Sequence, residues 1–233
     1  MTIGIVGAMD EEIALLLEQL SDMKEEVQVG NRFYSGQLHG HQVVICKSGV
    51  GKVNAAITTQ VLVDRYQIKR LLFTGVAGAV APSLNIGDLV ISTACIQHDM
   101  DVSALGYKRG QIPYQETSTF EADHELVAVA ERVCQQLFAG RYTKGIVLSG
   151  DQFIANRDQV QELYEVFNGA CTEMEGAAVA QACMVNDIPF VIIRSMSDKA
   201  DGSAHVNFAE FTVKASEHSY RIVAEMLKQL PAV

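Results

Sequence analysis

The sequence has few cysteines, no long apolar run and no basic stripe, and each absence excludes a class of protein. Its five cysteines are odd in number, widely spaced and mostly inside apolar segments, so neither a disulfide framework nor a zinc site is expected. No stretch reaches the roughly 18 uninterrupted apolar residues that a membrane-spanning helix needs. The formal net charge of −10 argues against a protein that binds the phosphate backbone of nucleic acids. We therefore expect neither a membrane nor a nucleic acid as a partner.

Linkers and targeting segments are also lacking. The 233 residues contain four prolines and no Pro- or Ser-rich stretch, which predicts one domain over residues 1–233. The apolar start, residues 3–9, is too short for a signal peptide and leads directly into Asp10, Glu11 and Glu12. This start indicates a cytoplasmic protein. With 48% hydrophobic and 20% charged residues, the chain can bury one large core.

Short apolar runs alternate with helical patterns along the chain. Several of the runs are apolar on both faces, which is typical of strands that are covered by helices on both sides. The predicted strands cover residues 2–7, 43–47, 70–75, 88–92, 145–149 and 189–195. The predicted helices cover residues 10–20, 52–66, 123–138, 175–185 and 207–229, with Asn207 and Glu210 as a capping box of the last one.

Residues 31–47 follow a different pattern, since two apolar runs are joined through Gly36 and through His39, Gly40 and His41. This pattern predicts an antiparallel hairpin. A hairpin beside parallel strands gives a mixed sheet. The predicted fold is therefore α/β, a three-layer αβα sandwich with a central mixed β-sheet.

Carboxylates stand where a core is expected. Glu173 and Glu175 lie among small apolar residues, and Asp198 follows the apolar run 190–193. Acidic residues are rarely buried without a partner. A carboxylate beside a ligand can accept hydroxyl hydrogen bonds when it is ionised, or deliver a proton when burial keeps it neutral, and sugar chemistry uses both roles. The alternative is that these residues are strand or helix ends that face water.

The glycine and histidine motifs fail as cofactor or metal sites. Residues 46–53 lack a glycine at Cys46 and a hydroxyl residue at Val53, so they are no phosphate loop, and residues 74–79 lack the dinucleotide fingerprint. Such glycines predict turns that let the backbone approach a ligand at the carboxyl ends of the strands, or simply tight turns. His98, Asp99 and Asp101 are too close in sequence to converge on one ion, which indicates a surface turn.

Seven segments together resemble the 5′-methylthioadenosine/S-adenosylhomocysteine nucleosidases, in the right order and over nearly the whole chain. They are residues 7–12, 47–52, 74–78, 98–102, 149–153, 173–175 and 194–198. The resemblance implies a purine nucleoside phosphorylase-like fold. It also implies hydrolysis of the bond between adenine N9 and ribose C1′ of methylthioadenosine, S-adenosylhomocysteine and 5′-deoxyadenosine, in methionine salvage and the recycling of S-adenosylmethionine by-products.

The resemblance implies a catalytic role for each of five residues. Asp198 protonates adenine N7, and Ser197 orients Asp198. Glu175 binds the ribose hydroxyls. Glu12 positions and deprotonates the attacking water with help from Arg194. Because its predicted place in the first helical turn favours the ionised form, Glu12 suits a base better than an acid; the alternative is an exposed N-terminal acid.

The resemblance also implies substrate contacts, a homodimer and no cofactor or metal. Phe153 stacks on adenine, the backbone of Ile154 reads the Watson–Crick edge, and Met174 lies under the sugar. The other implied contacts are Met9, Val50, Val76, Ala77, Gly78, Glu173 and Phe208 of the chain itself, and Val102, Leu105, Tyr107 and Pro113 of the neighbouring subunit. For Met9 and Val50 ordinary core packing is the alternative.

Two positions around the implied site differ from some members of the family, and one segment has two interpretations. Val76 stands where some members of the family have Ser, and Leu105 where some have Phe. Residues 199–206 form either a mobile lid or a plain surface loop.

Two other functions compete with hydrolysis. A phosphorylase would need arginines beside the ribose, but Arg194 is the only arginine in a matched segment and Glu12 would repel phosphate. A catalytically silent nucleoside-binding protein would not need Glu12, Glu175 and Asp198 together.

Overall fold

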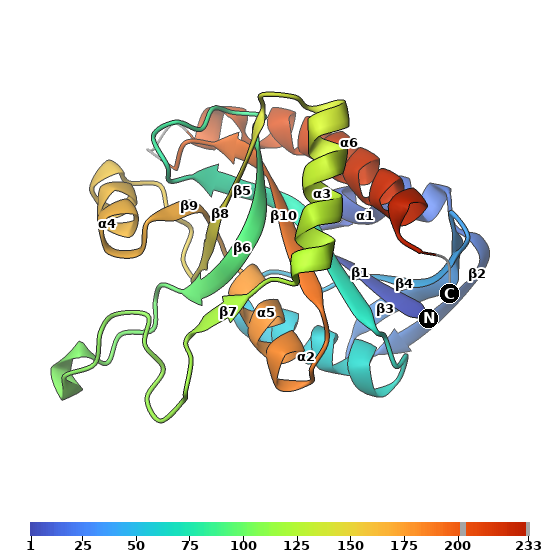
Figure 1. The fold of residues 1–233 in the computed structure, drawn as a ribbon, viewed down its shortest axis with the longest axis horizontal. Helices are drawn as coiled ribbons and strands as arrows, with labels where there is room; N and C mark the ends of the chain where they lie inside the picture. The colour runs from blue at the N-terminus through green and yellow to red at the C-terminus, as the bar shows by residue number, and fades with distance from the viewer. Residues whose placement is uncertain (201–203, 232–233) are drawn as a thin grey trace.

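A ten-stranded mixed sheet forms the centre of the protein in the computed structural model, which describes residues 1–200 and 204–231 (Figure 1). The strand order is β10-β6-β8-β9-β5-β1-β4-β3-β2, with β7 beside β6. Strand β10 also pairs with β5, so β5, β10, β6, β8 and β9 form a closed ring. The strands are β1 (Thr2–Gly7), β2 (Ser21–Gln28), β3 (Asn31–Leu38), β4 (His41–Lys47), β5 (Arg70–Ala79), β6 (Leu89–Gln97), β7 (Thr119–Glu121), β8 (Tyr142–Ser149), β9 (Gly169–Glu173) and β10 (Phe190–Asp198).

Helices cover both faces of this sheet, which confirms the predicted α/β fold with a mixed sheet. Helices α1, α3 and α6 pack together on one face, and α2 and α5 pack together on the other (Figure 1). Helix α4 lies to one side, next to β9 (Figure 1). The helices are α1 (Asp10–Glu18), α2 (Lys52–Asp64), α3 (His124–Leu137), α4 (Arg157–Phe167), α5 (Gly176–Val185) and α6 (Ala204–Gln229). None of the helices in the described part of the chain is both long and apolar enough to cross a membrane.

The central strands hold two cores apart. In β5, Leu72 is buried among the residues of α1, α3 and α6, whereas its neighbours Leu71 and Phe73 are buried on the side of α2 and α5. Side chains of a strand alternate between its faces, so a strand between two helical layers must be apolar at every position. The five cysteines are free and buried, which agrees with their position in apolar segments of the sequence.

The predicted strands, the hairpin and all five predicted helices are present, and two local predictions need correction. Helix α6 begins at Ala204, so Asn207 lies inside the helix and cannot form a capping box at its start. His98 lies in a turn directly after β6, as predicted, but it is buried rather than at the surface, and its backbone N–H donates to the carbonyl of Ser149 at 2.9 Å.

The parallel strands β1, β4, β5 and β10 bring their carboxyl ends to one edge of the sheet. The chain leaves β1 at Ala8, β4 at Ser48 and β10 at Asp198. Ligands of α/β sheets commonly bind at such an edge. The carboxyl edge of this sheet is therefore the expected location of a ligand-binding site.

Candidate active site

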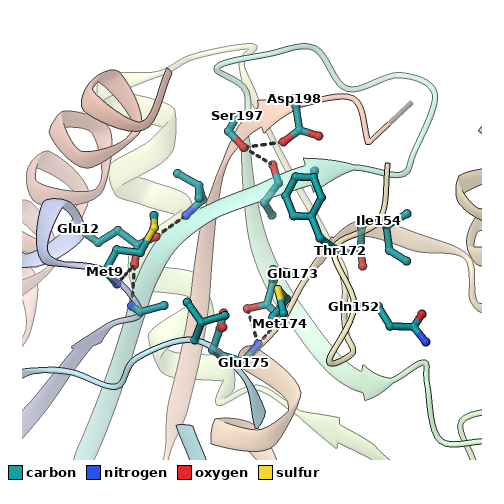
Figure 2. A pocket seen from close by; sticks show the side chains of 16 residues that line it. Met9, Glu12, Gln152, Ile154, Thr172, Glu173, Met174, Glu175, Ser197 and Asp198 are labelled. Atoms are coloured by element: carbon teal, nitrogen blue, oxygen red, sulfur yellow. Dashed lines mark hydrogen bonds between the residues drawn. The ribbon is translucent and has the colours of Figure 1, made fainter. Parts of the chain in front are cut away.

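A cavity of about 340 Å³ opens at this edge, large enough for a small organic ligand (Figure 2). Its walls come from segments far apart in the sequence: the start of α1, the loop after β4, the end of β5, the loop after β8, the junction of β9 and α5, and the end of β10. The lining residues are Ala8, Met9, Glu12, Val50, Val76, Ala77, Gly78, Gln152, Phe153, Ile154, Thr172, Glu173, Met174, Glu175, Ser197 and Asp198.

Glu12 lies on one side of the cavity and is held by three backbone N–H groups (Figure 2). Its Oε2 accepts hydrogen bonds from Ala8 at 2.6 Å and from Met9 at 3.0 Å, and its Oε1 accepts one from Val76 at 2.9 Å. The contact from Val76 uses the backbone, so it does not depend on the side chain at that position. The carboxylate of Glu12 is therefore fixed in place from both sides.

Glu12 does lie in the first turn of α1, as predicted, but burial and not this position dominates its ionisation. Burial raises the pKa of Glu12 above its ordinary value, although the charge of Arg194 and the N–H groups of Val76, Met9 and Ala8 act in the opposite direction. Glu12 is only 3% exposed, and burial penalises the charged form more than one helix terminus favours it. A raised pKa suits a general base that works near neutral pH.

Arg194 lies behind the cavity wall rather than in it. It is 1% exposed, its guanidinium carbon lies 4.0 Å from the ring centre of Phe73, and its Nη2 donates to Glu173 Oε2. Gly75 brings Arg194 and Glu12 together, since a Cβ at that position would lie 2.5 Å from Arg194 Nη1 and 2.4 Å from Glu12 Oε1. Burial acts to lower the pKa of Arg194, but the charges of the nearby carboxylates outweigh it and the pKa is raised.

Glu173 and Glu175 stand at the junction of β9 and α5. Glu175 Oε1 accepts a hydrogen bond from the N–H of Gly51 at 2.8 Å. Glu173 accepts from Gly176 at 2.9 Å, from Ser149 and from Arg194, so its oxygens are already engaged within the protein. Both carboxylates line the cavity, but Glu175 is the one with fewer hydrogen bonds to the protein.

Asp198 lies on the wall across from Glu175 (Figure 2). Its Oδ2 accepts a hydrogen bond from Ser197 Oγ at 2.8 Å, and its Oδ1 accepts one from the N–H of Ala200 at 2.7 Å. Consecutive residues of a regular strand point to opposite faces, yet Ser197 and Asp198 both line the cavity. An irregularity explains this, because the pairing of β10 with β5 shifts register between Met196 and Asp198.

The rest of the wall is largely apolar. Met9, Val50, Phe153, Ile154 and Met174 all contribute to it, as the sequence predicts. Three lining residues were not expected from the sequence: Ala8, Gln152 and Thr172. Ala8 and Gln152 are inside matched segments and could have been inferred from them, whereas Thr172 carried no signal except its place before Glu173.

Some predicted site residues lie elsewhere. Val102, Leu105, Tyr107 and Pro113, expected from a neighbouring subunit, belong to the segment between β6 and β7, which extends away from the body of the molecule (Figure 1). Leu105 is 72% exposed there. The side chain of Phe208 and residues 201–203 of the expected lid lie outside the described residues. Within residues 1–200 and 204–231, no three His, Cys, Asp or Glu side chains are grouped as metal ligands.

The ionisation of Glu175 should make the stability of the protein depend on pH. Burial and then the charge of Glu173 raise the pKa of Glu175 from 4.5 to about 7, although Arg194 and the N–H of Gly51 lower it. Between these two values the folded protein holds a proton that the unfolded chain has lost, so the free energy of unfolding falls as pH rises and levels off above about 7.

We expect Glu175→Gln to remove this dependence. At pH 8 the variant should be more stable than the parent by at least about 1 kcal/mol, or roughly 2–4 °C in Tm, and at pH 5 the two should be similar. Thermal denaturation at both pH values measures this. Glu18→Gln, at an exposed position, is the control. The same difference in Tm at pH 5 and pH 8 would contradict the assignment.

Comparison with known proteins agrees with this fold and this cavity. Residues 2–228 match the family described as the phosphorylase superfamily, which is the class of protein that the fold and the site define. A 5′-methylthioadenosine/S-adenosylhomocysteine nucleosidase from Bacillus thuringiensis (strain Al Hakam) is 42% identical over 231 residues, which cover 99% of this chain and all of that protein. Within the superfamily, the chain belongs to the family of these nucleosidases, which confirms the resemblance seen in seven segments.

Solved structures give the same answer. The nucleosidase from Colwellia psychrerythraea 34H, in complex with adenine, superposes with a TM-score of 0.94 at 40% identity, over 100% of this chain and 96% of that one. The nucleosidase from S. pneumoniae, with the transition-state inhibitor MT-ImmA, has a TM-score of 0.93 at 38% identity, over 99% of this chain and 100% of that one.

Proposed function

We propose that this protein hydrolyses the N-glycosidic bond of 5′-methylthioadenosine and S-adenosylhomocysteine, releasing adenine and the 5′-thio-substituted ribose. The observation that carries the proposal is the presence of Glu12, Glu175 and Asp198 around one largely apolar cavity. Cleavage of this bond develops positive charge on the sugar and negative charge on the base. Carboxylates on different walls can stabilise the positive charge on the sugar and deliver a proton to the base at the same time. We extend the proposal to 5′-deoxyadenosine, which has the same base and bond.

The geometry supports a division of labour among the carboxylates. Asp198, oriented by Ser197, protonates adenine N7 and makes adenine a neutral leaving group. Glu175 accepts hydrogen bonds from the ribose hydroxyls. Glu12, with Arg194 beside it, positions water and takes its proton as the water attacks C1′. The released sugar thereby gains a hydroxyl at C1′, and the base gains a proton.

The apolar wall fits the base and the 5′ group. Phe153 stacks on adenine, with the backbone of Ile154 at its edge. Met174 lies under the sugar beside Glu173, while Val76, Ala77 and Gly78 form the strand along which the nucleoside lies. Met9 and Val50 line the slot for the 5′-thio substituent.

Water is the proposed acceptor rather than phosphate. Arg194 is buried and engaged with Glu173, so it is poorly placed to bind phosphate in the cavity. The three carboxylates would also repel an anion there. Adenine release from methylthioadenosine should therefore proceed at the same rate with and without added phosphate and yield free methylthioribose.

The test is adenine release in phosphate-free buffer, repeated with phosphate, with identification of the sugar. A requirement for phosphate and a sugar 1-phosphate product would make the protein a phosphorylase and remove Glu12 from its role. Binding of methylthioadenosine without release of adenine in either buffer would indicate a nucleoside-binding protein.

We also propose a homodimer in which the segment between β6 and β7 completes the partner's 5′ slot. The projection of this segment, with Leu105 largely exposed, supports the proposal (Figure 1). One sheet built from strands of both halves of the chain supports residues 1–233 as one catalytic domain. Five free cysteines support a cytoplasmic location.

A further inference from the structure

Ser149 ends strand β8 behind the wall of the cavity and is fully buried. Its Oγ donates a hydrogen bond to Glu173 Oε1 and accepts one from the N–H of Ala177 at 2.7 Å. Ser149 is not among the residues that line the cavity. Any effect of this hydroxyl on a ligand must therefore pass through its two neighbours.

Glu173 connects Ser149 to two other parts of the site, Arg194 and the start of α5. Its Oε2 accepts from Arg194 Nη2, and both of its oxygens lie 2.9 Å from the N–H of Gly176, the first residue of α5. A Cβ on Gly176 would lie 3.2 Å from these oxygens, so the bare glycine allows the close approach. Glu173 thus ties the guanidinium of Arg194 to the start of α5, next to Glu175.

The position of the guanidinium determines its distance to Glu12. Arg194 has Phe73 on one side and Glu173 at its Nη2, while its Nη1 faces Glu12 across Gly75. A rotation of the Glu173 carboxylate would carry the guanidinium with it. A hydroxyl that holds this carboxylate at its other oxygen therefore acts on both Arg194 and Glu12.

We propose that Ser149 is a positioning residue of the active site: through Glu173 it holds Arg194 beside Glu12 and holds the start of α5 beside the sugar. This inference rests on the proposed function, and it assigns Glu173 mainly to this support rather than to the substrate. Without the hydroxyl, Glu173 loses a donor and Ala177 loses an acceptor. The carboxylate is then free to turn, and Arg194 loses its fixed orientation.

The first test is a double-mutant cycle between Ser149→Ala and Glu173→Gln. We expect Ser149→Ala to lower kcat/KM for adenine release about tenfold, as loss of a hydrogen bond to a charged group does. Because Ser149 acts through Glu173, the double variant should lose no more than Glu173→Gln alone. Losses that multiply, or a folded Ser149→Ala variant within about twofold of the parent, would overturn the proposal.

Ser92→Ala is the matched control. Ser92 is equally buried, and its Oγ accepts the N–H of Ile192 at 2.9 Å, but this hydrogen bond involves neither Glu173 nor any residue that lines the cavity. This variant loses a buried hydroxyl and an acceptor, and its activity should equal that of the parent. A loss of activity in Ser92→Ala as large as that in Ser149→Ala would attribute both to general destabilisation.

A pH profile tests the link if Ser149→Ala does not fold. Glu175 faces the charges of Glu173 on β9, Arg194 on β10 and Glu12 on α1, and the charge of Glu173 raises the pKa of Glu175. Glu173→Gln should lower kcat because it loses the charged contact with Arg194, and it should move the acid limb of kcat/KM to lower pH because Glu175 no longer faces that negative charge. An unmoved limb with an unchanged kcat would overturn the proposal.

A measurement without turnover separates this inference from the proposed function. The guanidinium resonances of Arg194 in the intact protein, assigned with Arg194→Lys, should shift in Ser149→Ala and stay in place in Ser92→Ala. If the parent releases no adenine but the Arg194 resonances still shift in Ser149→Ala, the proposed function is refuted and the positioning role stands. Resonances that do not shift in Ser149→Ala would overturn the positioning role, whatever the activity.

Discussion

Asp198→Asn should lower kcat for adenine release from methylthioadenosine about 10³-fold, within the range expected for loss of a general acid. The variant should fold normally, because asparagine can repeat both contacts of Asp198. Its oxygen can accept the N–H of Ala200, and its amide can donate to Ser197 Oγ, which is then free to donate to the carbonyl of Ala77 at 3.4 Å. The loss therefore reports on the proton rather than on packing.

A substrate that needs no proton on its leaving group separates the two explanations. The nitrophenolate of a nitrophenyl riboside departs as a stable anion, so Asp198→Asn should cleave this substrate at a rate close to that of the parent. Adenine release and nitrophenolate release are both followed by absorbance. Near-normal release of adenine by Asp198→Asn, or an equal loss on both substrates, would remove Asp198 from the role of acid.

Much of the fold could be predicted from the sequence because the composition of the central strands reflects how they are buried. A strand such as β5 is apolar at consecutive positions only because two helical layers cover it. Strand β2 was missed for the opposite reason, since it is an edge strand whose residues are nearly all exposed and therefore lack an apolar pattern. Helix α4 was missed although Asn156 caps it, with its side chain accepting from Asp158 and Gln159 at 2.8 and 3.2 Å.

The site was predictable in its residues but not in its connections. Carboxylates beside apolar runs indicated Glu175 and Asp198, and the matched segments added most of the wall. The shift in register that turns Ser197 toward the cavity depends on the pairing of β10 with β5, about 120 residues away in sequence. The hydrogen bond between Ser149 and Glu173 likewise joins two strands, so no local sequence pattern predicts it.

Glu12→Gln should abolish most of the hydrolysis, with kcat reduced by about 10²–10⁴-fold, because an amide cannot take a proton from water. The substitution also disturbs the site itself. All three hydrogen bonds to Glu12 come from N–H donors, and Glu12 Oε1 and Arg194 Nη1 both lie next to Gly75. In either orientation of the glutamine amide, its NH₂ group faces backbone N–H donors whose hydrogen bonds the carboxylate of Glu12 accepts. Two donors then face each other and a hydrogen bond is lost. Glu11→Gln, at an exposed position in the same helical turn, removes the same charge and should leave kcat unchanged.

Azide separates the loss of a base from this disturbance. Azide is a nucleophile that needs no deprotonation, so it should restore adenine release in Glu12→Gln and give a ribosyl azide in place of the free sugar. The loss of one carboxylate from the wall also weakens the repulsion of an anion at that position. If azide leaves the variant inactive while its Tm matches that of the parent, Glu12 has a role other than proton removal. If the variant turns over normally without azide, the water must be activated by another group, for which Glu175, with few hydrogen bonds to the protein, becomes the candidate.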